Sequence, residues 1–329
     1  MDEVISVGPR SATLFTNGEV RHLAHLQPST SYVEGRLTFD TGPDLGSLLS
    51  RVVTMNDVHF GELECGKING STEGVLSVDP GTTPYPQRMN VSACADAKEL
   101  NPDAVIVKGD LTSFGTLEEF GDFRTCYESA FGDRLTYVRG NHDSFPGLDY
   151  ASWPVQLVDV PGLRVVLLDT SRRGEVGGFL DAAQLASLHR AAESTSSSVI
   201  VMGHHPIVLP EVSSDGHRNL DPSDSQQLLG VLLSHPNVVA YTAGHTHRCR
   251  KIDVEGLAMV EVAAVKDFPG AFAEYQVYEH GIVQLVHRAS SPEAMEWAER
   301  TRAMFAGLYG PYAMGTLADR SFTLPRRRP

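Results

Sequence analysis

The sequence predicts an α/β protein of the α/β/β/α type, in which two β-sheets pack between outer layers of helices and a small β-module precedes them. From residue 51 onward, apolar runs typical of buried strands alternate with helical patterns, and further strand patterns follow residue 247 without helices between them. At 329 residues with 41% hydrophobic content, the chain is long enough to bury a large core.

Residues 1–50 are expected to form a partial β-sandwich-like module docked on the main domain, because so short a segment cannot complete a sandwich. The short β-prone segments are residues 4–7, 12–16, 20–26 and 32–39. Asn17-Gly18 is a strong signal for a two-residue hairpin turn. The stretch from Leu26 to Tyr32 resembles the tyrosine-corner turn of fibronectin type III domains and similar sandwiches. We expect a structural cap here rather than a substrate gate.

Residues 51–290 are expected to form the main domain. The spacing of apolar residues predicts helices at 91–100, 116–131, 181–192 and 223–233, the last with Ser223 as its N-cap. The segments 251–254, 257–263, 271–278 and 282–287 are predicted to be antiparallel strands on a second sheet.

Two further segments stand apart from this alternation. Residues 61–87 are rich in Gly, Ser, Thr and Pro without clear periodicity, and we interpret them as an insertion or lid, since long loops inside compact domains are often functional. Residues 291–329 are expected to form a C-terminal helix, capped by Ser291 and running through Phe305, followed by a solvated tail that ends in Arg326-Arg327-Arg328.

The charge balance argues against a polyanionic partner. Lys and Arg number 27 against 41 Asp and Glu, for a formal net charge of -14, which disfavours a broad nucleic-acid or anionic-membrane surface. A small anionic substrate would instead need local positive charge, and bound metal ions supply it.

Cysteine usage and hydropathy predict a reduced, cytoplasmic protein. No stretch reaches the roughly 20 apolar residues that a membrane span requires, and the N-terminal residues lack a signal-peptide pattern. The four cysteines are widely spaced without a C-x-x-C pair, so a disulfide framework is not expected. Cys65 and Cys249 lie near polar motifs, but we expect packing rather than metal or redox roles for them.

Five predicted strand ends are each followed by polar side chains of the types that bind metals. The five motifs are Asp57-Val58-His59, Gly109-Asp110, Gly140-Asn141-His142-Asp143, Gly203-His204-His205 and Gly244-His245-Thr246-His247. The carboxyl ends of neighbouring strands lie along one edge of an open α/β sheet, so we expect these side chains to converge on one site.

Carboxylate, imidazole and amide donors together favour Mn, Fe or Zn over Ca or a thiolate-lined Zn site. Asp57 and His59 are two residues apart, so on a regular strand they would face the same way. Asp110 offers two carboxylate oxygens and could bridge two ions, about 3.5 to 4 Å apart as in two-metal hydrolases. Each motif alone is a weak signal, and their ordered combination is a strong one.

The ordered series D-x-H, G-D, G-N-H-D, G-H-H and G-H-T-H resembles the calcineurin-like metallophosphoesterase superfamily, over roughly residues 50 to 290. The resemblance implies a two-sheet metallophosphoesterase sandwich with two divalent or mixed-valence metal ions. It implies Asp57, His59, Asp110 and His247 around one ion, and Asp110, Asn141, His204 and His245 around the other.

Within that superfamily, the sequence is similar to the bacterial class III cyclic nucleotide phosphodiesterases. The similar stretches are residues 102–105 with 108–112, 168–171, 178–185 and 204–206. This similarity implies a 3′,5′-cyclic nucleotide such as cAMP as the substrate, and a homodimer as a candidate assembly. The N-terminal module and the insertion after His59 depart from the pattern.

The expected reaction is hydrolysis of a phosphodiester by in-line attack of a hydroxide that bridges the two ions, because metal binding lowers the pKa of water towards neutrality. His142 is not assigned as a ligand, so we expect it to hydrogen-bond the phosphate and protonate the leaving alkoxide. Asp143 either orients the ring of His142 or forms the turn. Asn141 is expected to contact the substrate, and His205 either does so or makes a buried structural hydrogen bond.

Two alternatives to a cyclic nucleotide phosphodiesterase stay open at this point. One keeps the chemistry but acts on glycerophosphodiesters or other small phosphodiesters and phosphomonoesters. The other is a non-catalytic scaffold of the same fold, which is disfavoured because every ligand position and the proton donor are present.

Overall fold

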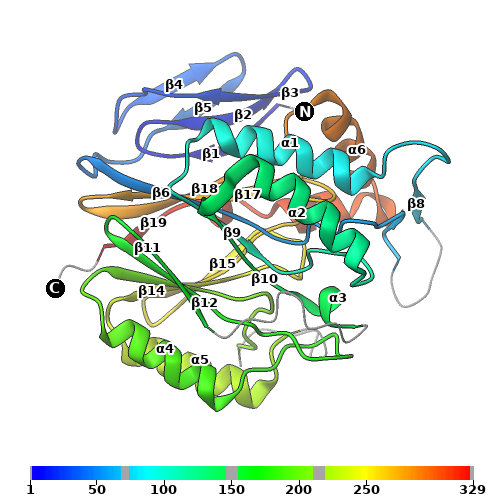
Figure 1. Ribbon diagram of the computed structural model, residues 1–329. Coiled ribbons are helices and arrows are strands. Elements are labelled where there is room, and N and C mark those ends of the chain that lie inside the picture. The colour runs from blue at the N-terminus through cyan, green and yellow to red at the C-terminus, as the bar shows by residue number, and fades with distance from the viewer. Residues whose placement is uncertain (1, 68–73, 146–154, 210–218, 327–329) are drawn as a thin grey trace.

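Two mixed β-sheets with helices on their outer faces make up most of the molecule (Figure 1). The structure is a computed structural model and describes residues 2–67, 74–145, 155–209 and 219–326. An apolar core between the two sheets contains side chains of both, including Ile106 from one and Ile200 from the other. The predicted α/β/β/α architecture is confirmed.

Each sheet has six strands. The first has the spatial order β10 (Leu135–Val138), β9 (Ala104–Lys108), β6 (Leu48–Met55), β17 (Ala271–Tyr278), β18 (Gly281–Arg288) and β19 (Ser321–Pro325). The second has the order β11 (Gln156–Val160), β12 (Leu163–Leu167), β13 (Ser198–Met202), β14 (Val238–Ala243), β16 (Leu257–Glu261) and β15 (Arg250–Val254). Strands β10, β9 and β6 are parallel, as are β12, β13, β14 and β16.

The strands after residue 247 divide between the two sheets, so the prediction that they share a second sheet was wrong. β15 and β16 extend the second sheet, whereas β17 pairs antiparallel with β6 in the middle of the first. β17 is buried along its whole length, with Tyr275 between the sheets and Phe272 under the helices. A strand that is apolar on both faces needs cover on both sides, and the middle of the first sheet provides it.

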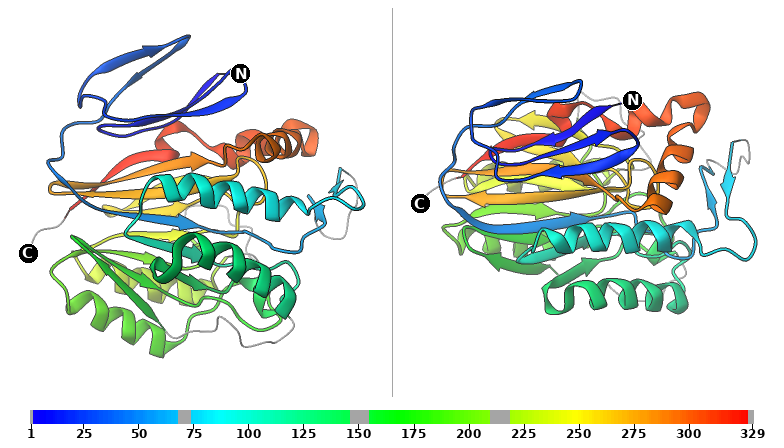
Figure 2. Two further views of the ribbon diagram at one scale, coloured as in Figure 1. Left: turned by 45° about the horizontal axis from the view of Figure 1, so that its top comes forward. Right: turned by 90° about the horizontal axis from the view of Figure 1, so that it is seen from above.

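The helices form two outer layers (Figures 1 and 2). α1 (Tyr85–Glu99), α2 (Leu117–Phe131) and α6 (Pro292–Arg302) pack on the first sheet, and α4 (Ala182–Glu193) and α5 (Pro222–Ser234) on the second. The shorter elements are η1 (Gly132–Arg134), α3 (Asn141–Ser144), η2 (Phe305–Gly307), α7 (Tyr309–Met314) and α8 (Leu317–Arg320). Within the described ranges, no helix is long and apolar enough to cross a membrane.

Helix boundaries follow the capping signals in part. Thr116 and Asp181 accept hydrogen bonds from the first turns of α2 and α4, at the predicted starts. α1 begins at Tyr85, inside the predicted insertion and before the predicted start at residue 91. Its N-cap is a proline that makes no side-chain hydrogen bond, so the sequence carries no capping signal for this start. α5 is capped by Asp221 rather than Ser223, and α6 ends at Arg302, before Phe305.

The N-terminal residues form a three-stranded sheet and a separate hairpin, which lie against the first sheet (Figure 2). Their strands are β1 (Glu3–Val7), β2 (Ala12–Thr16), β3 (Glu19–Leu23), β4 (Ser31–Glu34) and β5 (Leu37–Asp40). Asn17 and Gly18 both have positive φ, as the expected two-residue turn requires. The segment 32–39 is a hairpin that turns at Gly35, not one strand. The Tyr32 hydroxyl accepts a 2.8 Å hydrogen bond from the Gln27 N–H, a tyrosine-corner contact.

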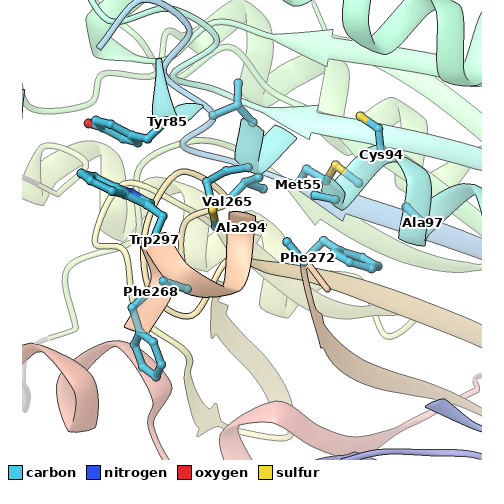
Figure 3. Close-up of a cluster of buried hydrophobic side chains, with 14 of the residues drawn as sticks. Met55, Tyr85, Cys94, Ala97, Val265, Phe268, Phe272, Ala294 and Trp297 are labelled. Carbon is cyan, nitrogen blue, oxygen red and sulfur yellow. The ribbon is translucent and has the colours of Figure 1, made fainter. Parts of the chain in front are cut away.

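A buried aromatic pair between α1 and α6 contacts the loop between β16 and β17 (Figure 3). The rings of Tyr85 and Trp297 stack with centroids 4.2 Å apart. The indole N–H of Trp297 donates to the backbone carbonyl of Lys266 at 3.2 Å. Packing of the core therefore positions a charged loop that borders the functional site.

Candidate metal centre

Four of the five polar motifs line one cavity of about 1170 Å³, whose walls include His59, Asp110, Asn141, His245 and His247. His204 of the fifth motif is buried beside Asp110. The motifs follow β6, β9 and β10 of the first sheet and β13 and β14 of the second. Convergence at strand ends was therefore predicted correctly, but the site lies across the edges of two sheets rather than along one.

The motif backbones leave the strands in an uncommon conformation. Asp57, His59, Asp110, His245 and His247 all have positive φ, between 47° and 68°. L-residues seldom adopt this region, and such strain concentrates at functional sites. β6 ends at Met55, so the expectation that Asp57 and His59 share one face of a regular strand was wrong.

Glycines beside the motifs permit a very close approach between the loops. A Cβ on Gly140 would collide with the carboxylate and backbone of Asp110, and one on Gly109 would collide with the His204 ring. These glycines therefore set the spacing of the donor atoms.

The carboxylate of Asp110 lies at the centre of the cluster. Its Oδ2 is 3.3 Å from Nε2 of His59 and 3.3 Å from Nε2 of His204. Its Oδ1 accepts a 3.0 Å hydrogen bond from the His142 backbone N–H. The side chain of Asn141 adjoins the same cluster, with Oδ1 3.2 Å from His204 Nε2.

The other donors gather on the two sides of Asp110. On one side, donor atoms of Asp57, His59 and His247 lie within 4.8 Å of one another, with Asp57 Oδ1 3.4 Å from His247 Nε2. On the other side, the rings of His204 and His245 have centroids 5.1 Å apart. The structure thus brings all seven sequence-predicted metal ligands to one site.

Two buried imidazoles of the cluster fit metal ligands. Among the described residues, both ring nitrogens of His59 and Nε2 of His245 are buried without a hydrogen bond, although carboxylate oxygens lie 3.0 and 3.3 Å from the His59 nitrogens. A buried polar atom without a partner is costly, and coordination to a cation would satisfy it. The residues present therefore fit a metal centre with imidazole and carboxylate ligands.

Electrostatics of the cluster reflect two buried carboxylates. Burial would raise the pKa of Asp57 and of Asp110, but neighbouring imidazoles outweigh it and hold both pKa values well below their ordinary range. Burial opposes protonation of His204 and His247 as well, yet the carboxylates raise their pKa values to about 9 and about 10.

His142 is held by a different group from the one expected. Its Nδ1 donates a 2.8 Å hydrogen bond to the carbonyl of Ser113, which leaves Nε2 for other partners. The prediction that Asp143 orients this ring was therefore wrong. The Asp143 carboxylate instead accepts from the backbone N–H groups of Leu111, Thr112 and Gly140, so it braces the loop that carries Asp110.

His205 is engaged by the protein at both ring nitrogens. Nδ1 is 2.9 Å from the hydroxyl of Thr170, and Nε2 is 3.1 Å from the carbonyl of Val176. The ring is fully buried. These contacts favour the buried structural role over the substrate contact that was its alternative.

Sequence reasoning missed two carboxylates behind the histidines. Glu62 Oε2 lies 3.0 Å from Nδ1 of His59, and Asp267 Oδ2 lies 3.3 Å from Nδ1 of His247. Lys266 Nζ donates to both oxygens of Glu62, at 2.6 and 2.7 Å. A carboxylate behind a metal-binding imidazole fixes its orientation and raises its basicity. In the sequence, only the position of Glu62, three residues after His59, indicated that a carboxylate could lie beside one of these histidines.

Replacing Glu62 by glutamine is expected to weaken metal binding by about 10- to 100-fold, because the amide lacks the negative charge that lies 3.0 Å from Nδ1 of His59. Titration calorimetry with Mn²⁺ measures the effect, and thermal unfolding without metal checks that the variant is folded. Glu128→Gln is the matched control, since Glu128 is an exposed partner of Arg124 outside the cavity lining. Equal affinities for both variants would remove Glu62 from the centre.

Comparison with known proteins gives a family match over most of the main domain. A family model described as calcineurin-like phosphoesterase matches residues 50–249. The 3′,5′-cyclic adenosine monophosphate phosphodiesterase CpdA of Pseudomonas aeruginosa is 30% identical over 152 residues, which cover 44% of this chain and 54% of that protein. The cAMP/cGMP dual specificity phosphodiesterase of Mycobacterium tuberculosis is 32% identical, covering 45% of this chain and 49% of that protein. The match thus spans about half the length of these curated relatives.

A relative of another substrate class is also similar. The probable glycerophosphodiester phosphodiesterase of Arcobacter nitrofigilis is 29% identical over 45% of this chain and 57% of its own length. Among solved structures, a dimetal phosphatase from Danio rerio has a TM-score of 0.60 at 16% identity, covering 74% of this chain and all of that one. At that identity, the likeness establishes the fold alone.

Proposed function

Because the chain belongs to the calcineurin-like phosphoesterase family, we propose that it hydrolyses a small phosphodiester at two metal ions, with a 3′,5′-cyclic nucleotide such as cAMP as substrate. The single observation that carries this proposal is the position of Asp110, whose Oδ2 lies 3.3 Å from both His59 and His204. One carboxylate between two sets of donors suits a pair of ions.

Asp110 would contribute to both metal sites. Asp57, His59 and His247 would hold one ion with it, and Asn141, His204 and His245 would hold the other. The mixed oxygen and imidazole donors favour Mn, Fe or Zn. When bound, such ions polarise the phosphoryl group and lower the pKa of water towards neutrality.

His142 is the group of this chain that we assign to proton transfer. Its ring centroid lies 4.6 Å from that of His59, and the Ser113 carbonyl holds its Nδ1 proton. Because the Nδ1 proton is held by Ser113, Nε2 would give a proton to the leaving alkoxide from the imidazolium form of the ring, and burial, which lowers the pKa of His142, favours release of that proton. A positioned proton donor of this kind contributes about 10²- to 10⁴-fold to the rate.

Removal of metal is expected to destabilise the protein as well as to abolish hydrolysis. Mn²⁺ at 100 times its Kd would stabilise the folded state by about 2.7 kcal/mol, provided that it binds only that state. Thermal unfolding before and after treatment with EDTA, followed by re-addition of Mn²⁺, measures this shift. An unfolding temperature that changes neither on treatment with EDTA nor on re-addition of Mn²⁺ would contradict a metal centre and favour a non-catalytic scaffold.

A substrate panel tests the proposed activity. Purified protein loaded with Mn²⁺ is assayed against cAMP, a glycerophosphodiester and bis(4-nitrophenyl) phosphate. We expect cAMP to be cleaved with a kcat/KM at least as high as that of the glycerophosphodiester. Negligible turnover of cAMP beside fast cleavage of the glycerophosphodiester would favour glycerophosphodiesters as the substrate class. The relative from Arcobacter nitrofigilis is named for that class.

A further inference from the structure

One side of the cavity is formed by an aromatic and apolar segment that follows the last residue of the family match. Five side chains of this segment line the cavity, and we call them the C-terminal wall: Met304, Phe305, Leu308, Tyr309 and Tyr312. They belong to η2, α7 and the residues around them, well beyond residue 249. A ligand bound to the C-terminal wall would therefore occupy the same cavity as the metal centre.

The C-terminal wall is fastened directly to the metal-binding loops. The Tyr312 hydroxyl donates a 2.9 Å hydrogen bond to the carbonyl of Thr246, the residue between His245 and His247. The Tyr309 hydroxyl donates at 2.7 Å to Asp267, whose other oxygen faces His247. A group bound on the wall is thus held next to the phosphorus site.

Three of the five wall residues present side-chain surface instead of burying it, whereas Met304 and Tyr309 are buried and support them. Leu308 is 73% exposed, Tyr312 44% and Phe305 36%. The rings of Tyr309 and Tyr312 are stacked with centroids 6.2 Å apart, and the guanidinium of Arg248 lies 5.5 Å from the centroid of Tyr312. Aromatic side chains and a guanidinium plane in a concave site are the groups on which nucleobases stack.

We propose that the C-terminal wall binds the base of the cyclic nucleotide and so sets the substrate class of the metal centre. This inference rests on the proposed phosphodiesterase function. The phosphate would lie at the metal ligands while the base stacks against Phe305 or Tyr312. A glycerol substituent has no π-face and would gain little from this surface.

The test compares a nucleotide with the same phosphodiester lacking its base. The substrates are cAMP and the 3′,5′-cyclic phosphate of methyl ribofuranoside, and the variants are Phe305→Leu and Tyr312→Leu, which keep apolar volume but lose the ring. We expect at least one variant to lose about 5- to 150-fold in kcat/KM for cAMP, mainly through KM, and to keep its rate on the substrate without a base.

Three controls separate stacking from damage to the centre. Tyr312→Phe keeps the ring and loses the bond to Thr246, so it should retain the preference for the base. Leu317→Ala changes an exposed apolar residue outside the cavity lining and should behave like the wild type. Calorimetry with 5′-AMP and ribose 5-phosphate on Mn²⁺-loaded protein gives the same comparison at equilibrium, independently of turnover.

Each outcome decides the inference. Equal losses on both substrates, or no loss on cAMP in either ring variant, would overturn the role of the wall while leaving the phosphodiesterase in place. Wild-type protein that cleaves the glycerophosphodiester but not cAMP would overturn the proposed substrate, and with it the role of the wall. A loss confined to the base-bearing ligands would support the proposal.

Discussion

Replacement of Asp110 by asparagine is expected to abolish hydrolysis and to remove metal from the centre. The amide keeps the shape of the side chain, but it loses the charge that faces both His59 and His204 at 3.3 Å. Even groups behind the ligands change metal affinity by about 10- to 100-fold when they are replaced, so a shared ligand should cost more than 100-fold. Metal content by mass spectrometry and kcat on cAMP should fall together.

Asp122→Asn is the matched control for this variant, because Asp122 is exposed on α2 away from the cavity. It should keep both metal content and turnover. An Asp110→Asn protein that retains two ions per chain would rule out a bridging carboxylate.

His142→Ala is expected to lower kcat on cAMP by about 10²- to 10⁴-fold while leaving the metal content unchanged. The reason is that an alkoxide is a poor leaving group without a proton, whereas 4-nitrophenolate leaves unprotonated. The same variant should therefore lose much less activity on bis(4-nitrophenyl) phosphate. Rates on the two substrates, measured side by side, give the size of the proton-transfer contribution.

His25→Ala serves as the control here, since His25 is an exposed residue of the N-terminal segment. Its rates should match those of the unaltered protein. Equal losses of His142→Ala on both substrates would assign this residue to phosphate binding rather than to proton transfer.

The strands and the polar residues that follow them were predictable because both depend on local sequence. The apolar runs before Asp57, Asp110, Asn141, His204 and His245 all proved to be strands, and the polar residues after them converge. Burial of a parallel strand needs a continuous apolar run, and the chain must turn where that run stops. Both signals are visible in a few consecutive residues.

The surroundings of the ligands were not predictable, because they depend on contacts between distant parts of the chain. Asp267 reaches His247 from the loop before β17, and Tyr312 reaches Thr246 from α7. No local pattern indicates that either residue lies at the site. His142 donates its hydrogen bond to the carbonyl of Ser113 and not to Asp143. This choice likewise depends on backbone geometry, which the spacing of residues in the sequence does not reveal.

The most direct test of a centre that shares Asp110 is anomalous diffraction from crystals grown with Mn²⁺. The proposal predicts two peaks about 3.5 to 4 Å apart, with the Asp110 carboxylate between them and His59 and His204 on opposite ions. A single peak, or two peaks of which one lacks contact with Asp110, would contradict it.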